Sequence, residues 1–229
     1  MKKRMSKTDM VLAVGFVGLI GVLLTIISDF ILLGRPSSSY EFFKLGTESM
    51  ANIAEWRITV GTMVGVIALP FQTLGILPVY YGLKPSGRVL PLIFAITNAH
   101  ALLMGVAFHM SYAYIGSAWK HYYNNKITSD MVNRFDFYWK ILFIIMLIEI
   151  LFCSILYVVI LMKGKTLFPK WMAILNPFFA AILVFLLLFV LPAPIGGFIA
   201  PAVLNISTMV FVGLSMVIIF KRRMDIIGR

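Results

Sequence analysis

Residues 11–33 read VLAVGFVGLIGVLLTIISDFILL, an apolar run of 23 residues in which Asp29 is the only charged side chain. A helix of this length is about 34 Å long, enough to cross the roughly 30 Å hydrocarbon core of a bilayer. The run is too long for the hydrophobic region of a signal peptide, and no small-residue cleavage motif follows it. It is therefore predicted to be a retained first transmembrane helix.

The composition of the whole chain extends this interpretation. Hydrophobic residues make up 61% of the 229 residues and charged residues only 13%, and the mean hydropathy is +0.96. Soluble domains average about 45–50% apolar and about 25% charged residues, so the composition excludes a water-soluble protein. We expect an all-α, multi-pass protein of the cell membrane that forms a single domain over residues 1–229.

Six stretches are long and apolar enough to be spans. The predicted spans are residues 11–33, 58–83, 90–116, 138–162, 171–191 and 198–220. Pro70 and Pro78 are expected to kink the second span. Two sets of glycines predict close helix packing: Gly61 and Gly65 form a GxxxG motif, and Gly15, Gly18 and Gly21 give the first span a small-residue surface.

The basic residues predict the orientation. With six spans both termini lie on one side, together with the second and fourth connections. That side carries 13 of the 20 basic residues, namely Lys2, Lys3, Arg4, Lys7, Lys84, Arg88, Lys163, Lys165, Lys170, Lys221, Arg222, Arg223 and Arg229. By the positive-inside rule both termini are predicted to be cytoplasmic. The clusters are short and lie beside span ends, where they meet lipid headgroups, so nucleic acid is not an expected partner.

Polar residues at membrane depth are the main candidates for a functional site. With a rise of 1.5 Å per residue, Asp29 lies about 6 Å below the outer end of its span, and His109 and Asn205 about 10 Å below theirs. Arg57 is placed at the outer mouth of the second span, and Tyr112 one turn above His109. These five residues are predicted to converge on a polar cavity that opens toward the outer leaflet. A purely structural Asp29–Arg57 pair is an equal alternative.

His100 and Glu149 are predicted to form a second, buried polar pair. Each lies roughly 15 Å deep in its span, so the two match in depth. His100 and His109 are nine residues apart, a rotation of about 900°, so they point to opposite faces of one helix. A structural role for the pair is favoured over a role as a proton relay.

Other chemistries have little support in the sequence. The third histidine, His121, is in a connection, and no HxxxH or HExxH spacing occurs, so no metal site is expected. Nucleophile and nucleotide-binding motifs are also missing, so the catalytic residues stay unknown and no cofactor is expected. The sequence gives no oligomeric state.

Three short motifs resemble a prokaryotic family of six-helix integral membrane proteins of unknown function. They are Ser28-Asp29-Phe30-Ile31-Leu32-Leu33, Glu55-Trp56-Arg57 and Ala107-Phe108-His109-Met110-Ser111-Tyr112. The resemblance extends over nearly the whole chain and implies the same six-helix architecture. It draws attention to Asp29, Glu55, Arg57 and His109 but implies no activity.

Three functions are open on this basis. The first is binding of a membrane lipid or small amphiphile in the outer cavity, which needs apolar walls and a few convergent polar groups. The second is an intramembrane enzyme that modifies a lipid, with His109 as general acid–base and Asp29 orienting it. The third is a structural or accessory subunit, for which none of these residues needs to converge. The first is preferred.

Overall fold

The computed structural model describes residues 6–227, with side chains as far as Arg222, and every regular element in this range is a helix. Lys2, Lys3, Arg4 and Arg229 of the basic set lie outside the described residues, as does the side chain of Arg223. The elements are α1 (Lys7–Leu32), α2 (Ser39–Leu45), η1 (Gly46–Asn52), α3 (Glu55–Gln72), η2 (Thr73–Gly75), α4 (Ile76–Leu83), η3 (Lys84–Ser86), α5 (Val89–Tyr123), α6 (Ser129–Lys163), η4 (Lys170–Leu175), α7 (Pro177–Leu188), α8 (Ile195–Ile199), η5 (Ala200–Ala202) and α9 (Val203–Ile227).

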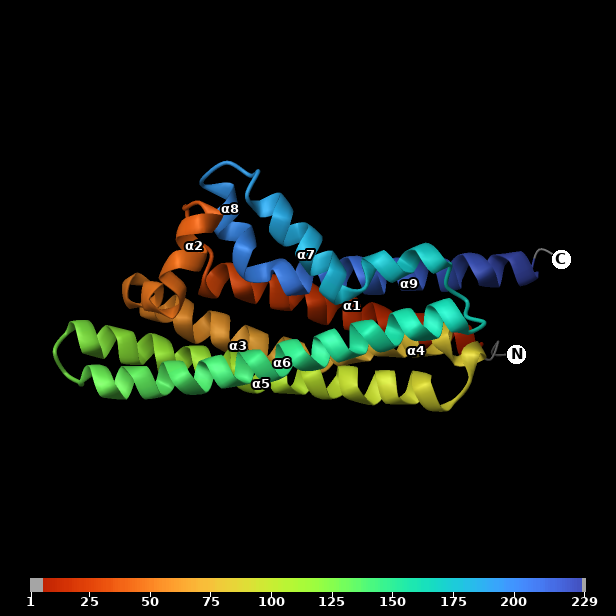
Figure 1. The fold of residues 1–229 in the computed structure, drawn as a ribbon, viewed down its shortest axis with the longest axis horizontal. Coiled ribbons are helices and arrows are strands. Elements are labelled where there is room, and N and C mark those ends of the chain that lie inside the picture. The colour runs from red at the N-terminus through yellow and green to blue at the C-terminus, as the bar shows by residue number, and fades with distance from the viewer. Residues whose placement is uncertain (1–5, 228–229) are drawn as a thin grey trace, which may run out of the picture.

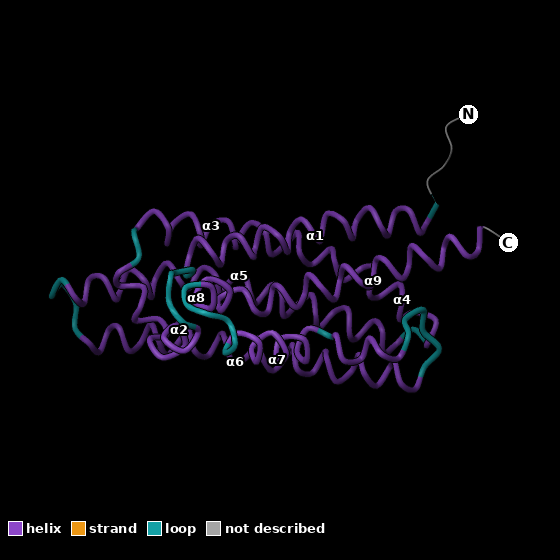
Figure 2. Tube along the Cα trace, turned by 90° about the horizontal axis from the view of Figure 1, so that it is seen from above, coloured by secondary structure: helices purple, strands orange, loops and turns teal. Residues whose placement is uncertain are grey.

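The long helices run lengthwise through one bundle, and both chain ends lie at the same end of it (Figures 1 and 2). We name this the proximal end, and the opposite end, where α1 ends and α3 begins, the distal end. Five helical segments of the described chain are long and apolar enough to cross a membrane, namely Lys7–Leu32, Glu55–Ser86, Val89–Tyr123, Ser129–Lys163 and Ile195–Arg222. By this criterion the chain is a membrane protein, and five of the six predicted spans correspond to such segments.

The remaining predicted span, 171–191, is not one continuous membrane-spanning helix. It consists of the 3-10 helix η4 followed by the 12-residue helix α7, which is only about 18 Å long. The break lies at Asn176-Pro177. A residue before proline is disfavoured in helical conformation, and here the Asn176 side chain instead accepts hydrogen bonds from the backbone of Phe178 and Phe179.

Helices α5 and α6 are longer than predicted. Each has 35 residues and is about 52 Å long, so the expected outer connection 117–137 shortens to residues 124–128. The extra turns are amphipathic rather than uniformly apolar, which is why they fell outside the predicted spans. η1 covers them at the distal end, where Thr47 donates to Asp136 at 2.7 Å and accepts from the indole of Trp119 at 3.2 Å.

The second predicted span is kinked, as the prolines indicate. Pro70 lies inside α3, which gives way to η2 before the chain continues as α4. The glycines of α1 pack against this region. A Cβ atom added at Gly18 would lie 2.5 Å from the Cα of Gly75, and one added at Gly21 would lie 2.8 Å from the carbonyl carbon of Phe71. Glycine is therefore required for α1 to approach the kinked segment backbone to backbone.

The connection between α1 and α3 contains two short helices, α2 and η1. Ser38 and Glu41 form a capping box that starts α2. The hydroxyl of Ser39 donates to the Leu188 carbonyl at 3.0 Å and so connects α2 to the end of α7. This contact positions the aromatic residues of α2 beside α7 at the distal end.

Candidate functional site

A cavity of about 590 Å³ lies between α1, α3, α5, α6, α7 and α9. Most of its lining is aliphatic or aromatic, and a few polar side chains interrupt it. Small-molecule sites in proteins have volumes of about 300–1,000 Å³, mostly apolar walls and a few placed polar groups. The cavity therefore has the size and the lining of a ligand site.

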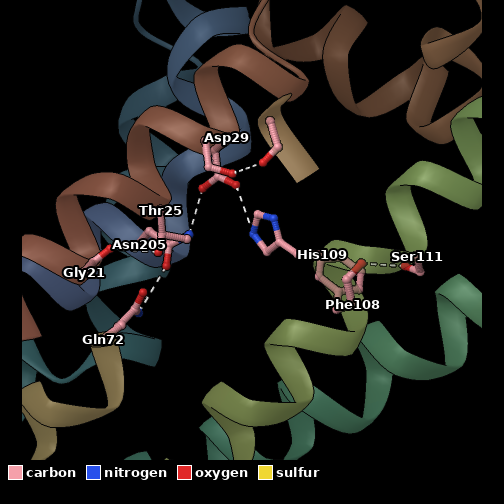
Figure 3. Close-up of polar contacts among 10 residues, drawn as sticks. Gly21, Thr25, Asp29, Gln72, Phe108, His109, Ser111 and Asn205 are labelled. Atoms are coloured by element: carbon pink, nitrogen blue, oxygen red, sulfur yellow. Dashed lines mark hydrogen bonds and ion pairs between the residues drawn. The ribbon is translucent and has the colours of Figure 1, made fainter. Parts of the chain in front are cut away.

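Three side chains form a hydrogen-bonded chain on one wall (Figure 3). The amide of Asn205, from α9, donates to Oδ2 of Asp29, from α1, at 2.7 Å. The oxygen of the same amide accepts from the amide of Gln72, from α3, at 3.3 Å. Asp29 and Gln72 are 4% and 2% exposed, so both polar groups are removed from solvent. The Oε1 atom of Gln72 has no hydrogen-bond partner among the described residues and is an acceptor still available to a ligand.

His109 approaches the same carboxyl group from α5. Its Nε2 atom lies 3.5 Å from Oδ1 of Asp29, and both side chains are buried. The other ring edge lies against Gly65 of α3, where an added Cβ atom would be 2.6 Å from Cε1 and closer still to Nδ1. The absence of a side chain at Gly65 is thus what admits the imidazole. The predicted meeting of Asp29 and His109 is therefore present, with α1 and α5 both packed against α3.

Aromatic side chains complete the distal wall. Tyr112 lies one turn beyond His109, with 5.9 Å between the two ring centroids. It also packs against Phe108 at 5.0 Å and against Trp139 of α6 at 5.9 Å. Tyr112 and Asn205, both predicted as lining residues, line the cavity together with Asp29 and His109.

The cavity lining reaches the protein surface at α2 and α7. Phe43, Ile182 and Phe185 line it and are also 43%, 43% and 38% exposed, so they border both the cavity and the protein surface. Phe43 and Phe185 contact each other with ring centroids 5.1 Å apart. The border of the opening is thus apolar and aromatic, which suits the passage of a hydrophobic chain.

Comparison with known protein families fits this picture. One family model matches residues 1–222, nearly the full chain. The chain belongs to the DUF6796 family, a family of unknown function. No curated protein and no solved structure gives a significant match. Membership of DUF6796 agrees with the resemblance to a family without an assigned activity, so the function has to be argued from the site.

Arg57 does not take the position expected for it in this DUF6796 chain. It is not among the described residues that line the cavity. Its guanidinium instead donates to the carbonyls of Ile31 at 2.7 Å, Phe30 at 3.3 Å and Gly34. The carbonyls at the end of α1 have no partners within the helix, and a cation at a helix C-terminus also opposes the helix dipole. The interpretation of an Asp29–Arg57 pair is therefore wrong, and Arg57 caps α1.

His100 and Glu149 are in contact, but they are not buried in the bundle. His100 Nδ1 lies 2.8 Å from Glu149 Oε1, while the His100 side chain is 60% exposed and that of Glu149 is 19% exposed. The prediction was right about the contact and wrong about the burial. The reason is helical geometry: His100 and His109 lie on opposite faces of α5, and His109 faces the cavity, so His100 faces outward.

Several lining residues were missed from the sequence. Gln72 is an amide in an otherwise apolar span, two residues after Pro70, and this signal could have identified it. Asn98 lies 11 residues before His109, a rotation of about 1100° that places both on one face of α5, so helical spacing could have identified it. Ser154 and Tyr157 gave no usable signal, because a serine or tyrosine in a membrane helix is common on any face.

Proposed function

We propose that the protein binds one lipid or small amphiphile in this cavity, with the polar group of the ligand at Asp29, Asn205 and His109. The observation that carries the proposal is the combination in one cavity of apolar walls, a hydrogen-bonded polar cluster and an aromatic opening. In hydrocarbon such polar groups are costly to leave unsatisfied, and a headgroup would satisfy them. With both termini in the cytoplasm, as the basic residues favour, the cluster belongs to the outer leaflet.

The alternative of a lipid-modifying enzyme has less support. A general base needs a ring nitrogen within hydrogen-bond reach of the substrate. One nitrogen of His109 faces Asp29 and the other faces Gly65, so a reaction would first require the ring to rotate. Ser111 is the nearest hydroxyl in sequence, but it donates to the Phe108 carbonyl at 2.5 Å, turned away from Asp29 (Figure 3). This arrangement favours His109 as a positioning residue.

The proposal is tested by filling the cavity. A Cβ atom added at Gly105, which lines the cavity, would meet Leu69 and Met146 only at ordinary distances of 3.4–3.9 Å. We expect Gly105→Phe to fold and to lose the lipid that co-purifies with the wild type in mild detergent, as measured by mass spectrometry. Gly213→Phe is the matched control, because an added Cβ there meets nothing within 4 Å. Equal lipid retention by Gly105→Phe and the wild type would overturn the proposal.

A further inference from the structure

The proximal part of the cavity contains a second group of polar side chains. Asn98 of α5 and Ser154 and Tyr157 of α6 all line it. Ser154 is 2% exposed and Tyr157 is fully buried. These residues take no part in the cluster around Asp29, so the cavity is polar in two separate places.

Two of these side chains are unsatisfied. The hydroxyls of Ser154 and Tyr157 have no hydrogen-bond partner within residues 6–222. The neighbouring Cys153, in contrast, donates its thiol to the Phe94 carbonyl at 3.9 Å. A buried hydroxyl without a partner is destabilising, and native structures usually avoid it. Two such groups on the wall of one cavity indicate that something in the cavity bonds to them.

The two polar regions are well separated. Asn98 and His109 both belong to α5 and are 11 residues apart, which corresponds to roughly 16 Å along the helix. Between them α5 presents Ala101, Leu102 and Gly105 to the cavity. The lining is thus polar, then apolar, then polar along the length of the helix.

We propose that the ligand is a bipolar amphiphile, with a second, neutral hydrogen-bonding group that binds to Ser154 and Tyr157. This inference rests on the proposed function and specifies its ligand class. Hydroxyls and an amide suit a hydroxyl or carbonyl group, and the described lining at this end contains no lysine or arginine to pair with an anion. An ordinary phospholipid ends in methyl groups and would leave both hydroxyls unsatisfied.

Two probes of equal chain length test the proposal: dodecanol, with one hydroxyl, and dodecanediol, with a hydroxyl on each terminal carbon. The ratio of their apparent Kd values is measured by native mass spectrometry for the wild type and for Ser154→Ala/Tyr157→Phe. Comparing ratios cancels the different partitioning of the two probes into detergent. We expect the preference for the diol to fall roughly tenfold in the variant, the value of one good hydrogen bond.

Two controls separate the possible outcomes. Tyr114→Phe removes a hydroxyl from an exposed position on α5 and should leave the preference unchanged. An equal diol preference in the wild type and the double variant would overturn the bipolar ligand and assign the two hydroxyls to water. Suppose that Gly105→Phe weakens the binding of both probes, while the diol preference is the same in the wild type and in Ser154→Ala/Tyr157→Phe. In that case only the bipolar ligand is refuted, and the proposed function stands. If Gly105→Phe leaves the apparent Kd of both probes unchanged, the proposed function is refuted too.

Discussion

Replacing Gly65 with alanine should displace His109 from Asp29. The added methyl group would lie 2.6 Å from Cε1 of His109 and 2.7 Å from the hydroxyl of Ser28, whereas ordinary contacts begin at 3.4 Å. The Cε1 atom therefore has to move by at least about 0.8 Å, from 2.6 to 3.4 Å, and the Nδ1 atom, which lies closer to the added methyl group, has to move further. The Nε2 atom of His109 is already 3.5 Å from Oδ1 of Asp29, at the limit of a hydrogen bond. A movement of this size away from Asp29 would therefore break the contact.

The energetic result is a balance of two opposed effects. Overpacking a buried site costs about 1–3 kcal/mol, while alanine in place of glycine favours a helix by up to about 1 kcal/mol. We expect Gly65→Ala to lower the free energy of unfolding by about 1–2 kcal/mol in an SDS titration, and also to reduce lipid retention. The matched control Gly213→Ala meets no neighbouring atom, so it should be neutral or stabilising and retain lipid.

A variant without the His109 imidazole tests whether this ring is what the methyl group of Gly65→Ala clashes with. In the His109→Ala background, Gly65→Ala should cost distinctly less than it does alone, because the larger of the two contacts has gone. An equal cost in both backgrounds would refute the proposed packing of His109 against Gly65. Unaltered stability and unaltered lipid retention in the single variant would refute it as well.

Three further results are expected. Cysteine at Asn124 should react with an impermeant thiol reagent in intact cells and cysteine at Ser86 should not, and the opposite pattern would reverse the predicted orientation. Arg57→Gln should lower the free energy of unfolding by about 1–3 kcal/mol without changing lipid content, since its partners are carbonyls outside the cavity; a loss of lipid at unchanged stability would contradict this. In bilayers, His100→Leu should destabilise the protein by leaving Glu149 unpaired, whereas replacing both by leucine should restore stability; a double variant worse than the single one would argue for a separate role of the pair.

The level of a residue along the bundle was predictable, because the rise of a helix is constant. This is why Asp29, His109 and Asn205 could be expected at one level, and the structure places all three around one cavity. The spans were predictable for the same reason wherever the apolar run was continuous. The Asn176-Pro177 break was visible in the sequence but was outweighed by the apolar residues on both sides.

Rotation about the helix axis was not predictable in the same way. Whether His100 faces the bundle or its surroundings depends on which face of α5 the neighbouring helices cover, and sequence spacing gives only relative angles. The position of Arg57 was not predictable for a second reason. Its partners are backbone carbonyls at the end of α1, and residue types do not show which backbone carbonyls are free to accept a hydrogen bond. The proximal hydroxyls of Ser154 and Tyr157 could be recognised only once the cavity beside them was known.

The glycine contacts of α1 also determine which wall of the protein can move. Gly18 and Gly21 allow α1 to touch the backbone of the kinked α3–η2–α4 segment, and Gly61 allows α3 to touch Leu32. Parts that interlock at this distance cannot slide or separate without breaking many contacts at once, so they behave as a rigid frame. The opposite wall contains α7, which is short, begins at a proline, packs against α9 and meets α2 through the hydrogen bond from Ser39 and the ring contact between Phe43 and Phe185. If a ligand enters and leaves the cavity, we expect α7, which starts at the Asn176-Pro177 break, to be displaced more easily than the α1–α3–η2–α4 frame.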